Sequence, residues 1–427
     1  MYFDLRKLIL FVLLVSQLCA EELTIEIEGG AVEALPIAVV PFDTSGQFEI
    51  NPAEIIKFDL SMSGKFRPLP EKSMISTPTS FEAINFKDWR VLGVENLVIG
   101  KVMENDNGHV IVFSLIDVFR ETELITRKIS YRFDGFRKAS HHVSDLIYRE
   151  LVGKQGNFST KIAYVVFKAS QNEYQLVVSD SDGHNPRTVF RSEQPLLSPA
   201  WSPSGASLAY VSFEDGRSAI FIQELKTGSR QKIRLGEGIT GSPAFSPDGE
   251  KLVLTSSKEG DSNLYVYNLV NDSIEQITSH GAIDTEGNWS PDGTSLIFTS
   301  GRSGGAQIYH IGLAGSSPKR LTFGLGPYNA NAEYSQDGES LILISRGGRG
   351  HRICLYHTAS REWKFLSDSI LDESPSFSPN GDMVIYSSKG QDSSKLVVVS
   401  TDGSMASRKF TLGEGDIREP AWGPVTD

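Results

Sequence analysis

The sequence predicts an all-β six-bladed β-propeller (C-terminal) preceded by a small α/β domain. Three observations predict this fold: an aromatic motif that occurs six times, a nearly constant period, and four strand-like runs in each period. Successive aromatic residues lie 44, 44, 45, 43 and 45 positions apart. The six aromatic residues are Trp201, Phe245, Trp289, Tyr334, Phe377 and Trp422.

Each repeat is predicted to supply four short antiparallel strands. The aromatic strand ends in Asp-Gly or a similar hairpin turn, and three further runs follow, as at 251–256, 263–268 and 273–278. Four short strands per repeat of this length are typical of a propeller blade. Pro243 and Pro247 bracket Phe245. Because proline cannot donate to a sheet ladder, we expect the aromatic strands to be innermost, with one free edge.

The ring is predicted to close by pairing strands from both ends of the repeat region. No second strand follows Trp422, and residues 161–165 mirror residues 207–211. We therefore expect one blade to combine three earlier strands with the last aromatic strand, so that no sheet edge in the ring stays open.

Residues 36–153 follow a different pattern and predict the α/β domain. Residues 36–42, 96–100 and 109–113 are expected strands. One helix is expected to begin at Asn51-Pro52 and stop at Gly64. A second, amphipathic helix over 136–151 is expected to end at Gly153. A polar linker at 154–160 then leads to the propeller at 161–427.

The first twenty residues are predicted to be a cleaved secretory signal. Arg6 and Lys7 precede a short apolar run at 8–15, and the expected cleavage lies between Ala20 and Glu21. The mature chain should be exported without stable membrane insertion. Its formal charge of −12 before cleavage argues against nucleic acid as a partner. The two cysteines are Cys19, within the signal, and Cys354, so no disulfide is expected within the mature chain.

Residues 21–35 allow two interpretations. Apolar and polar residues alternate before Gly29-Gly30, and the segment up to Lys57 has no basic residue. It could be a first strand of the α/β sheet, or a mobile strand that adds to a partner's sheet edge, with the glycines as a hinge. The candidate partner-binding residues here are Glu22, Leu23, Thr24, Ile25, Glu26, Ile27 and Glu28.

The loops that enter the innermost strands form the second candidate site. They occupy matched positions in the repeats, so we expect them to converge around one channel mouth and make it acidic. Solvated loop charges are the alternative interpretation. The candidate residues are Ile239, Thr240, Ser242, Asp284, Thr285, Glu286, Asp372, Glu373, Arg418 and Glu419.

The chain resembles the TolB family of the Tol-Pal cell-envelope system over essentially its whole mature length. Departures occur at Gly423 and Ser204, where the family usually has Ser and Asp. The resemblance is carried by Pro36-Ile-Ala-Val-Val-Pro-Phe, Ser63-Gly-Lys-Phe-Arg-Pro-Leu, Thr160-Lys-Ile-Ala-Tyr-Val-Val, Ser179-Asp-Ser-Asp-Gly-His-Asn, Ser198-Pro-Ala-Trp-Ser-Pro, Phe213-Glu-Asp-Gly-Arg-Ser-Ala and Leu371-Asp-Glu-Ser-Pro-Ser.

This resemblance implies a monomeric, non-enzymatic docking platform in the periplasm that needs no cofactor. It implies that a Pal-like peptidoglycan-associated lipoprotein binds at the channel mouth. A TolA-like inner-membrane protein would bind the N-terminal mature segment. The implied role is to support outer-membrane integrity and the invagination of that membrane during cell division.

The competing hypotheses are a propeller enzyme and a carbohydrate-binding protein acting on envelope polymer. Residues 301–305 match a nucleophile elbow around Ser303, but that elbow needs a strand-to-helix turn and this one is expected between two strands. Residues 180–185 resemble a calcium loop that lacks the glutamate ligand at its twelfth position. His141 and His142 are adjacent on a helix and should point apart, which argues against joint metal ligation.

Overall fold

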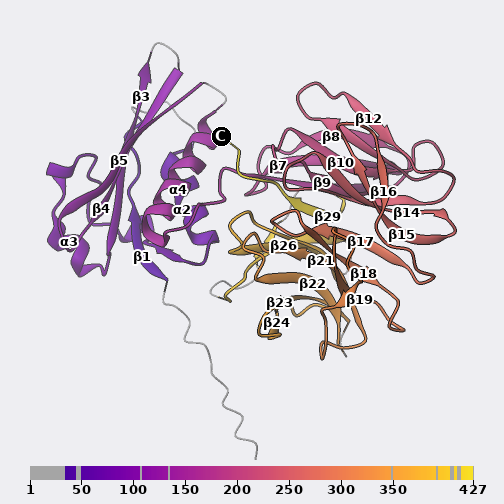
Figure 1. Ribbon diagram of the computed structural model, residues 1–427. Helices are drawn as coiled ribbons and strands as arrows, with labels where there is room; N and C mark the ends of the chain where they lie inside the picture. Colours follow the sequence, from indigo (N-terminus) through magenta and orange to yellow (C-terminus); the bar gives the residue numbers. More distant parts are fainter. Residues whose placement is uncertain are drawn as a thin grey trace, which may run out of the picture. The chain divides into compact units, whose positions relative to one another are not determined.

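The computed structural model describes residues 34–44, 50–105, 108–132, 135–347, 350–390, 393–403, 408–410 and 415–426. The predicted signal and the segment 22–28 lie outside the described residues. The described chain forms an α/β domain followed by a β-propeller, which confirms the predicted fold class (Figure 1).

The α/β domain is built on a five-stranded mixed sheet with the order β2-β1-β3-β4-β5. β1 is parallel to both β2 and β3, and the β3–β4 and β4–β5 pairs are antiparallel. Its strands are β1 (Leu35–Val39), β2 (Phe66–Pro68), β3 (Asn96–Asn105), β4 (Gly108–Asp117) and β5 (Thr122–Tyr131). Its helices are α2 (Pro52–Met62), α3 (Phe86–Val91) and α4 (Phe136–Val152), with single 3₁₀ turns η1 (Glu71–Ser73) and η2 (Phe81–Ala83).

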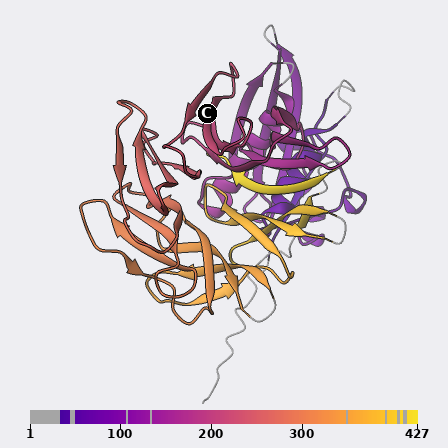
Figure 2. The same ribbon diagram turned by 90° about the vertical axis from the view of Figure 1, so that its right-hand side faces the viewer.

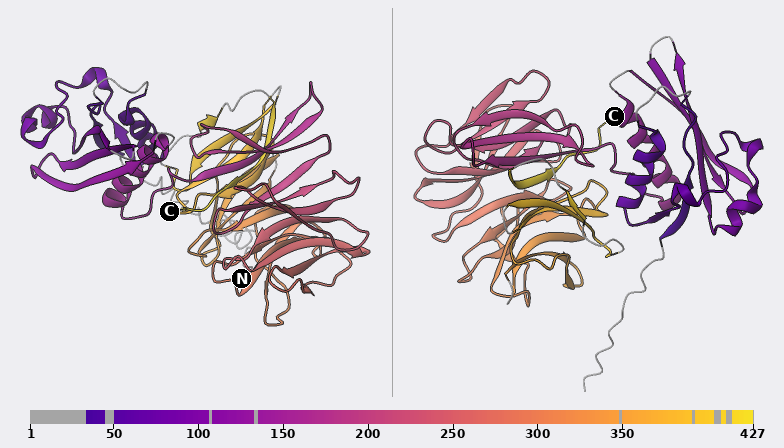
Figure 3. Two further views of the ribbon diagram at one scale, coloured as in Figure 1. Left: turned by 90° about the horizontal axis from the view of Figure 1, so that it is seen from above. Right: turned by 180° about the vertical axis from the view of Figure 1, so that it is seen from behind.

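Both predicted helices begin and end where the sequence signals them. The side chain of Asn51 accepts a hydrogen bond of 3.0 Å from the amide of Ala53, and Pro52 occupies the first helical position of α2. Gly153 ends α4 in the left-handed conformation, with φ of 82°. Figure 3 shows both helices on one side of the sheet.

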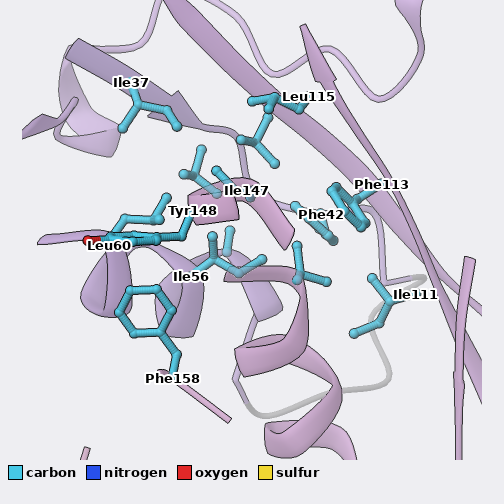
Figure 4. Packing of buried hydrophobic residues seen from close by; sticks show 14 of the residues in the cluster. Ile37, Phe42, Ile56, Leu60, Ile111, Phe113, Leu115, Ile147, Tyr148 and Phe158 are labelled. Atoms are coloured by element: carbon cyan, nitrogen blue, oxygen red, sulfur yellow. The ribbon is translucent and has the colours of Figure 1, made fainter. Parts of the chain in front are cut away.

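The main core of this domain lies between that helical layer and the sheet. Ile56 and Leu60 of α2 and Ile147 of α4 meet Ile37 and Phe113 of the sheet, all buried (Figure 4). Each such side chain contributes about 1.5–3 kcal/mol by leaving water. The opposite face of the sheet packs on a smaller cluster around the buried Trp89 of α3.

In the described part of the chain, the propeller consists of six four-stranded antiparallel sheets. Each aromatic strand lies at one end of its sheet, as expected for an innermost strand. The first blade consists of β9 (Leu196–Trp201), β10 (Ser207–Ser212), β11 (Ala219–Glu224) and β12 (Arg230–Ile233). The second consists of β13 (Thr240–Phe245), β14 (Lys251–Glu259), β15 (Asp261–Asn268) and β16 (Ile274–Gln276). The third consists of β17 (Asp284–Trp289), β18 (Ser295–Ser300), β19 (Gln307–Gly312) and β20 (Lys319–Arg320). The next two are β21 (Tyr328–Tyr334), β22 (Ser340–Arg346), β23 (His351–His357) and β24 (Trp363–Phe365); and β25 (Asp372–Phe377), β26 (Met383–Lys389), β27 (Ser394–Ser400) and β28 (Arg408–Phe410).

The last blade closes the ring as predicted. β29 (Asp416–Trp422) pairs with β6 (Lys161–Lys168), which continues through β7 (Glu173–Asp180) to β8 (Arg187–Ser192). Trp422 lies opposite Ile162 in this ladder, and its indole nitrogen donates a 2.9 Å hydrogen bond to the Thr160 hydroxyl. Figure 2 shows the yellow C-terminal strand beside magenta strands from the start of the propeller.

The turn that follows the aromatic strand explains why most repeats carry a serine and an aspartate here. In the second blade, the Ser246 hydroxyl accepts from the amide of Lys251 at 2.9 Å, and Asp248 accepts from the amide of Glu250 at 3.0 Å. The hydrogen bond from Ser246 is the main cause that lowers the pKa of Asp248. These bonds fix the hairpin, and a left-handed glycine completes it.

Neighbouring turns also contact each other through proline and glycine. A Cβ atom at Gly249 would lie 3.6 Å from Pro203, one at Gly293 would lie 3.7 Å from Pro247, and one at Gly338 would lie 3.8 Å from Pro291. In the fourth blade Gln336 replaces the proline, and the following Gly381 has no neighbour within 4 Å on its Cβ side.

The described helices all fall short of the length and apolar character needed to cross a membrane.

Candidate functional site

The innermost strands surround a central cavity of about 290 Å³. All six blades contribute equivalent residues to its wall, so the expected convergence of matched positions occurs. The wall consists of residues 198–201, 242–245, 286–288, 331–333, 374–376 and 419–422.

Each innermost strand carries a β-bulge where it lines this cavity. The first residue of every bulge is not glycine but has a positive φ, which costs about 1–2 kcal/mol per residue. A bulge re-aims side chains, and here it directs one residue per blade toward the channel. The six residues and their φ values are Ser198 (50°), Ser242 (49°), Glu286 (55°), Asn331 (50°), Ser374 (52°) and Glu419 (50°).

Two of these bulge residues link neighbouring blades through their carboxylates. Glu286 accepts hydrogen bonds from the amide of Asn331 at 2.8 Å and from the hydroxyl of Thr299 at 2.7 Å. Glu419 accepts from the amide of Ser198 across the ring closure. Burial raises the pKa of Glu419 to about 7, and the negative charges of Glu373 and Glu286 act in the same direction.

A third channel carboxylate, Glu333, lies two residues after the bulge residue of its strand and was not among the predicted site residues. It accepts a 3.1 Å hydrogen bond from the amide of Phe377, and burial raises its pKa to about 7. The channel is therefore polar and acidic, and its carboxylates are held by backbone amides.

Three predicted mouth residues are buried instead of exposed. Thr240, Asp284 and Asp372 have 0% exposure. Asp284 accepts a 2.6 Å hydrogen bond from the guanidinium of Arg302, and Asp372 accepts one from the Ser369 hydroxyl. These side chains hold the loops in place, and they cannot touch a partner while the loops keep this structure.

Other predicted residues do reach the surface. Glu373 and Arg418 are exposed, and Thr285 is half-buried. Ile239 is 62% exposed, and two isoleucines that were not among the predicted residues, Ile283 and Ile370, are 63% and 78% exposed. Ile239 and Ile283 each lie six residues before the aromatic position, so the repeat register carried a signal for them. The rim thus combines exposed isoleucines with carboxylates.

The structure places the other sequence motifs in two turns and on α4. Ser303 lies in an exposed hairpin turn between β18 and β19, which is not the strand-to-helix turn of a nucleophile elbow. Asp182 of the calcium-like loop bonds the guanidinium of Arg137. His141 is buried and His142 is exposed, so the two rings do point apart.

The chain matches two family descriptions. The TolB amino-terminal domain matches residues 23–124, and the TolB beta propeller domain matches residues 148–426. A Tol-Pal system protein TolB from Nitrosococcus oceani is 52% identical over 407 residues, which cover 94% of this chain and 93% of the relative. The chain belongs to the TolB family.

Further relatives agree with this assignment. TolB from Xanthomonas oryzae pv. oryzae is 49% identical over 98% of this chain and 97% of the relative. The crystal structure of TolB from Acinetobacter baumannii superposes with a TM-score of 0.86 at 36% identity, covering 92% of this chain and 97% of that one. The chain is thus a TolB-family component of the Tol-Pal system, and this assignment identifies it as non-enzymatic.

Proposed function

We propose that the channel mouth docks a Pal-like peptidoglycan-associated lipoprotein and that residues 22–28 bind a TolA-like inner-membrane protein. In this role the chain connects the outer membrane and peptidoglycan with the inner membrane, and so supports envelope integrity and invagination at division. Its place of action is the periplasm, which it reaches through the cleaved signal at 1–20. The observation that carries the proposal is the group of exposed isoleucines on the acidic rim of a channel.

Apolar anchors beside charged groups are the usual composition of a docking surface. Large apolar side chains with an exposure as high as that of Ile239, Ile283 and Ile370 lose water when a partner covers them, and this supplies affinity. The neighbouring carboxylate of Glu373 is exposed and would select a partner segment with basic or amide donors. The loops that carry these groups are held by buried hydrogen bonds such as Asp284–Arg302, so the surface is preorganised.

Replacing the rim isoleucines should weaken the Pal-like partner strongly. The double variant Ile239→Asp/Ile283→Asp is expected to lower the affinity about 100-fold, because two anchors of more than about 1 kcal/mol each are replaced by hydrated charges. Glu373→Lys should cost about tenfold and more at low salt. The measurement is calorimetric titration with the soluble domain of the lipoprotein.

The matched control is Val270→Asp, which changes an equally exposed apolar residue in the turn between β15 and β16. This variant should bind like the unchanged chain. Equal affinities for the rim and control variants would refute docking at the channel mouth.

Deleting residues 21–28 should abolish binding of the TolA-like partner. Leu23, Ile25 and Ile27 alternate with polar residues, so an added strand could present one apolar and one acidic face. The same titration with the partner's soluble domain measures the loss, and the affinity for the Pal-like protein reports any linkage between the sites. If the deletion left binding of the TolA-like partner intact, these residues would be only a strand of the α/β sheet.

A further inference from the structure

A buried row of charged groups joins the α/β domain to the propeller. His141 of α4 lies between two carboxylates, Asp59 of α2 and Asp182 in the turn after β7. Its Nδ1 is 2.8 Å from Oδ2 of Asp59, and its Nε2 is 3.5 Å from Oδ2 of Asp182. The exposure of the three residues is 2% for Asp59, 1% for His141 and 8% for Asp182.

This arrangement fits a shared proton better than a shared metal ion. One ligand atom from each of the three side chains lies within 4.8 Å of the others, so the spacing alone does not separate the two alternatives. The guanidinium of Arg137, however, is bonded to Asp182 and would repel a metal cation at this carboxylate. Nε2 is buried, faces this carboxylate and has no hydrogen bond within normal limits. A protonated ring offers an N–H to each side, and a neutral ring offers only one.

The hydrogen bonds around Asp59 place the neutral ring's proton on Nδ1. Asp59 accepts from His141 and also from the Ser144 hydroxyl at 2.6 Å, and both contacts favour its ionised form. If His141 is neutral, Nδ1–H therefore stays with Asp59, and a lone pair on Nε2 faces the carboxylate of Asp182. The contact between the two domains, rather than the contact within the α/β domain, is the one that depends on the second proton.

Several other charged groups surround the ring. Asp180 and His184 flank Asp182 on the propeller side, with His184 Nδ1 3.2 Å from Oδ2 of Asp182. Burial lowers the pKa of His141, but the negative charges of Asp59 and Asp182 outweigh burial, so its pKa ends above the ordinary value. Arg137 opposes this rise. Burial also raises the pKa of Asp59, although the charge of His141 and the hydrogen bonds from His141 and Ser144 oppose that rise. Because both of these hydrogen bonds are accepted by the ionised carboxylate, we assign the shared proton to His141.

We propose that Asp59, His141 and Asp182 form a protonation-dependent junction that holds the α/β domain on the propeller while His141 is charged. The junction acts beside permanent contacts, such as the 2.6 Å hydrogen bond from Tyr148 to Asp382 and the 2.8 Å ion pair between Lys154 and Asp382. The charged junction is fully formed below the pKa of an unfolded histidine. It weakens as pH rises through the higher pKa of His141 in the folded protein. Alkaline conditions therefore loosen the domain contact.

The first test measures the proton directly in the full chain. In nitrogen-15 NMR of labelled histidines, both ring nitrogens of His141 should keep the imidazolium signal to a higher pH than those of His142, whose pKa is lowered by burial. Asp182→Asn should lower the pKa of His141 by about one unit, because it removes one of two neighbouring charges. His142→Gln, on the adjacent exposed position, should leave that pKa unchanged. Loss of the imidazolium signal of His141 at a lower pH than that of His142, or the same pKa in Asp182→Asn, would overturn the proposal.

The second test asks whether the proton controls the domain contact. Trypsin cleavage after Lys154 in the linker reports how often the two domains separate. The ratio of the cleavage rates of Asp182→Asn and the unchanged chain, taken at the same pH, cancels the protease's own pH dependence. If Asp182 raises the pKa of His141 by about one unit, then by reciprocal linkage the proton on His141 strengthens the contact with Asp182 about tenfold. The ratio should therefore change by up to about tenfold between low and high pH.

The pH dependence of the cleavage ratio distinguishes the effect of the proton on His141 from the effect of the permanent charge on Arg137. An arginine side chain keeps its charge across this pH range. The contact of Arg137 that is lost in Asp182→Asn therefore changes the ratio of cleavage rates by the same factor at every pH. The contribution of His141 disappears above its pKa, and the ratio should therefore fall as pH rises. A ratio that stays constant across the titration would show that only Arg137 couples the domains, and the proposal would fail.

Discussion

A chain that ends at Gly415 is expected to lose the cooperative unfolding of its propeller. This truncation removes β29, and with it the buried side chains of Ile417 and Trp422. Removing a large buried side chain costs about 2–5 kcal/mol, so two of them approach the total stability of a typical protein. The edge of β6 would also lose its partner strand and become open to pairing with other chains.

Thermal unfolding followed by circular dichroism measures this effect. The matched control is a chain that ends at Pro424, which lacks the final residues but keeps β29 whole. The control should unfold cooperatively and close to the midpoint of the full chain. If both truncated chains melted alike, the pairing of β29 with β6 would not be a source of stability.

Arg302→Met is expected to destabilise the propeller by about 3–5 kcal/mol, because it leaves the buried carboxylate of Asp284 without its cation. The guanidinium donates to Asp284 at 2.6 Å and to the hydroxyl of Ser300 at 2.8 Å. Ser300 in turn donates to Asp284 at 2.6 Å, so the substitution disrupts a small network. A fall of roughly 10 °C in the unfolding midpoint should follow.

Ser303→Ala, at the next position and exposed, is the control for Arg302→Met. It should leave the midpoint within about 1 °C, since surface substitutions of this kind have small effects. Adding Asp284→Asn to Arg302→Met should restore part of the stability, because the stranded charge is then removed. A double variant no more stable than Arg302→Met alone would show that the charge is not the cause.

The blades and the closure were predictable because their signals are local. Strand alternation, the serine–aspartate turn and the proline positions all repeat within a few residues of each aromatic. Which of the mouth residues are buried was not predictable from local signals. Strict alternation cannot locate Asp284 and Asp372, because the bulge at Glu286 and at Ser374 inserts an extra residue and changes which side chains face the channel.

The α/β domain shows the same division between local and distant signals. The start of α2 at Asn51 and the end of α4 at Gly153 follow from single residues with strong preferences. The edge strand β5 mixes charged and apolar residues on a largely exposed surface and gave no clear pattern. The contact of His141 with Asp182 joins different domains, so no local pattern could predict it.

The replacement of proline by Gln336 makes the following turn differ from the equivalent turns of the other blades. In the described chain, five of the six innermost strands continue through such a turn into the next strand of their sheet, whereas β29 pairs with the earlier strand β6. In the blade after Gln336, the side chain of Asn380 donates a 2.8 Å hydrogen bond to the carbonyl of Gln155 in the linker. The backbone amide of Asn380 donates a 3.1 Å hydrogen bond to the side-chain oxygen of Asn157. The turn whose glycine lacks a proline cover is thus the turn that the linker occupies. The departure from the repeat therefore coincides with the one described turn where the covering groups come from the linker of the α/β domain and not from a neighbouring blade.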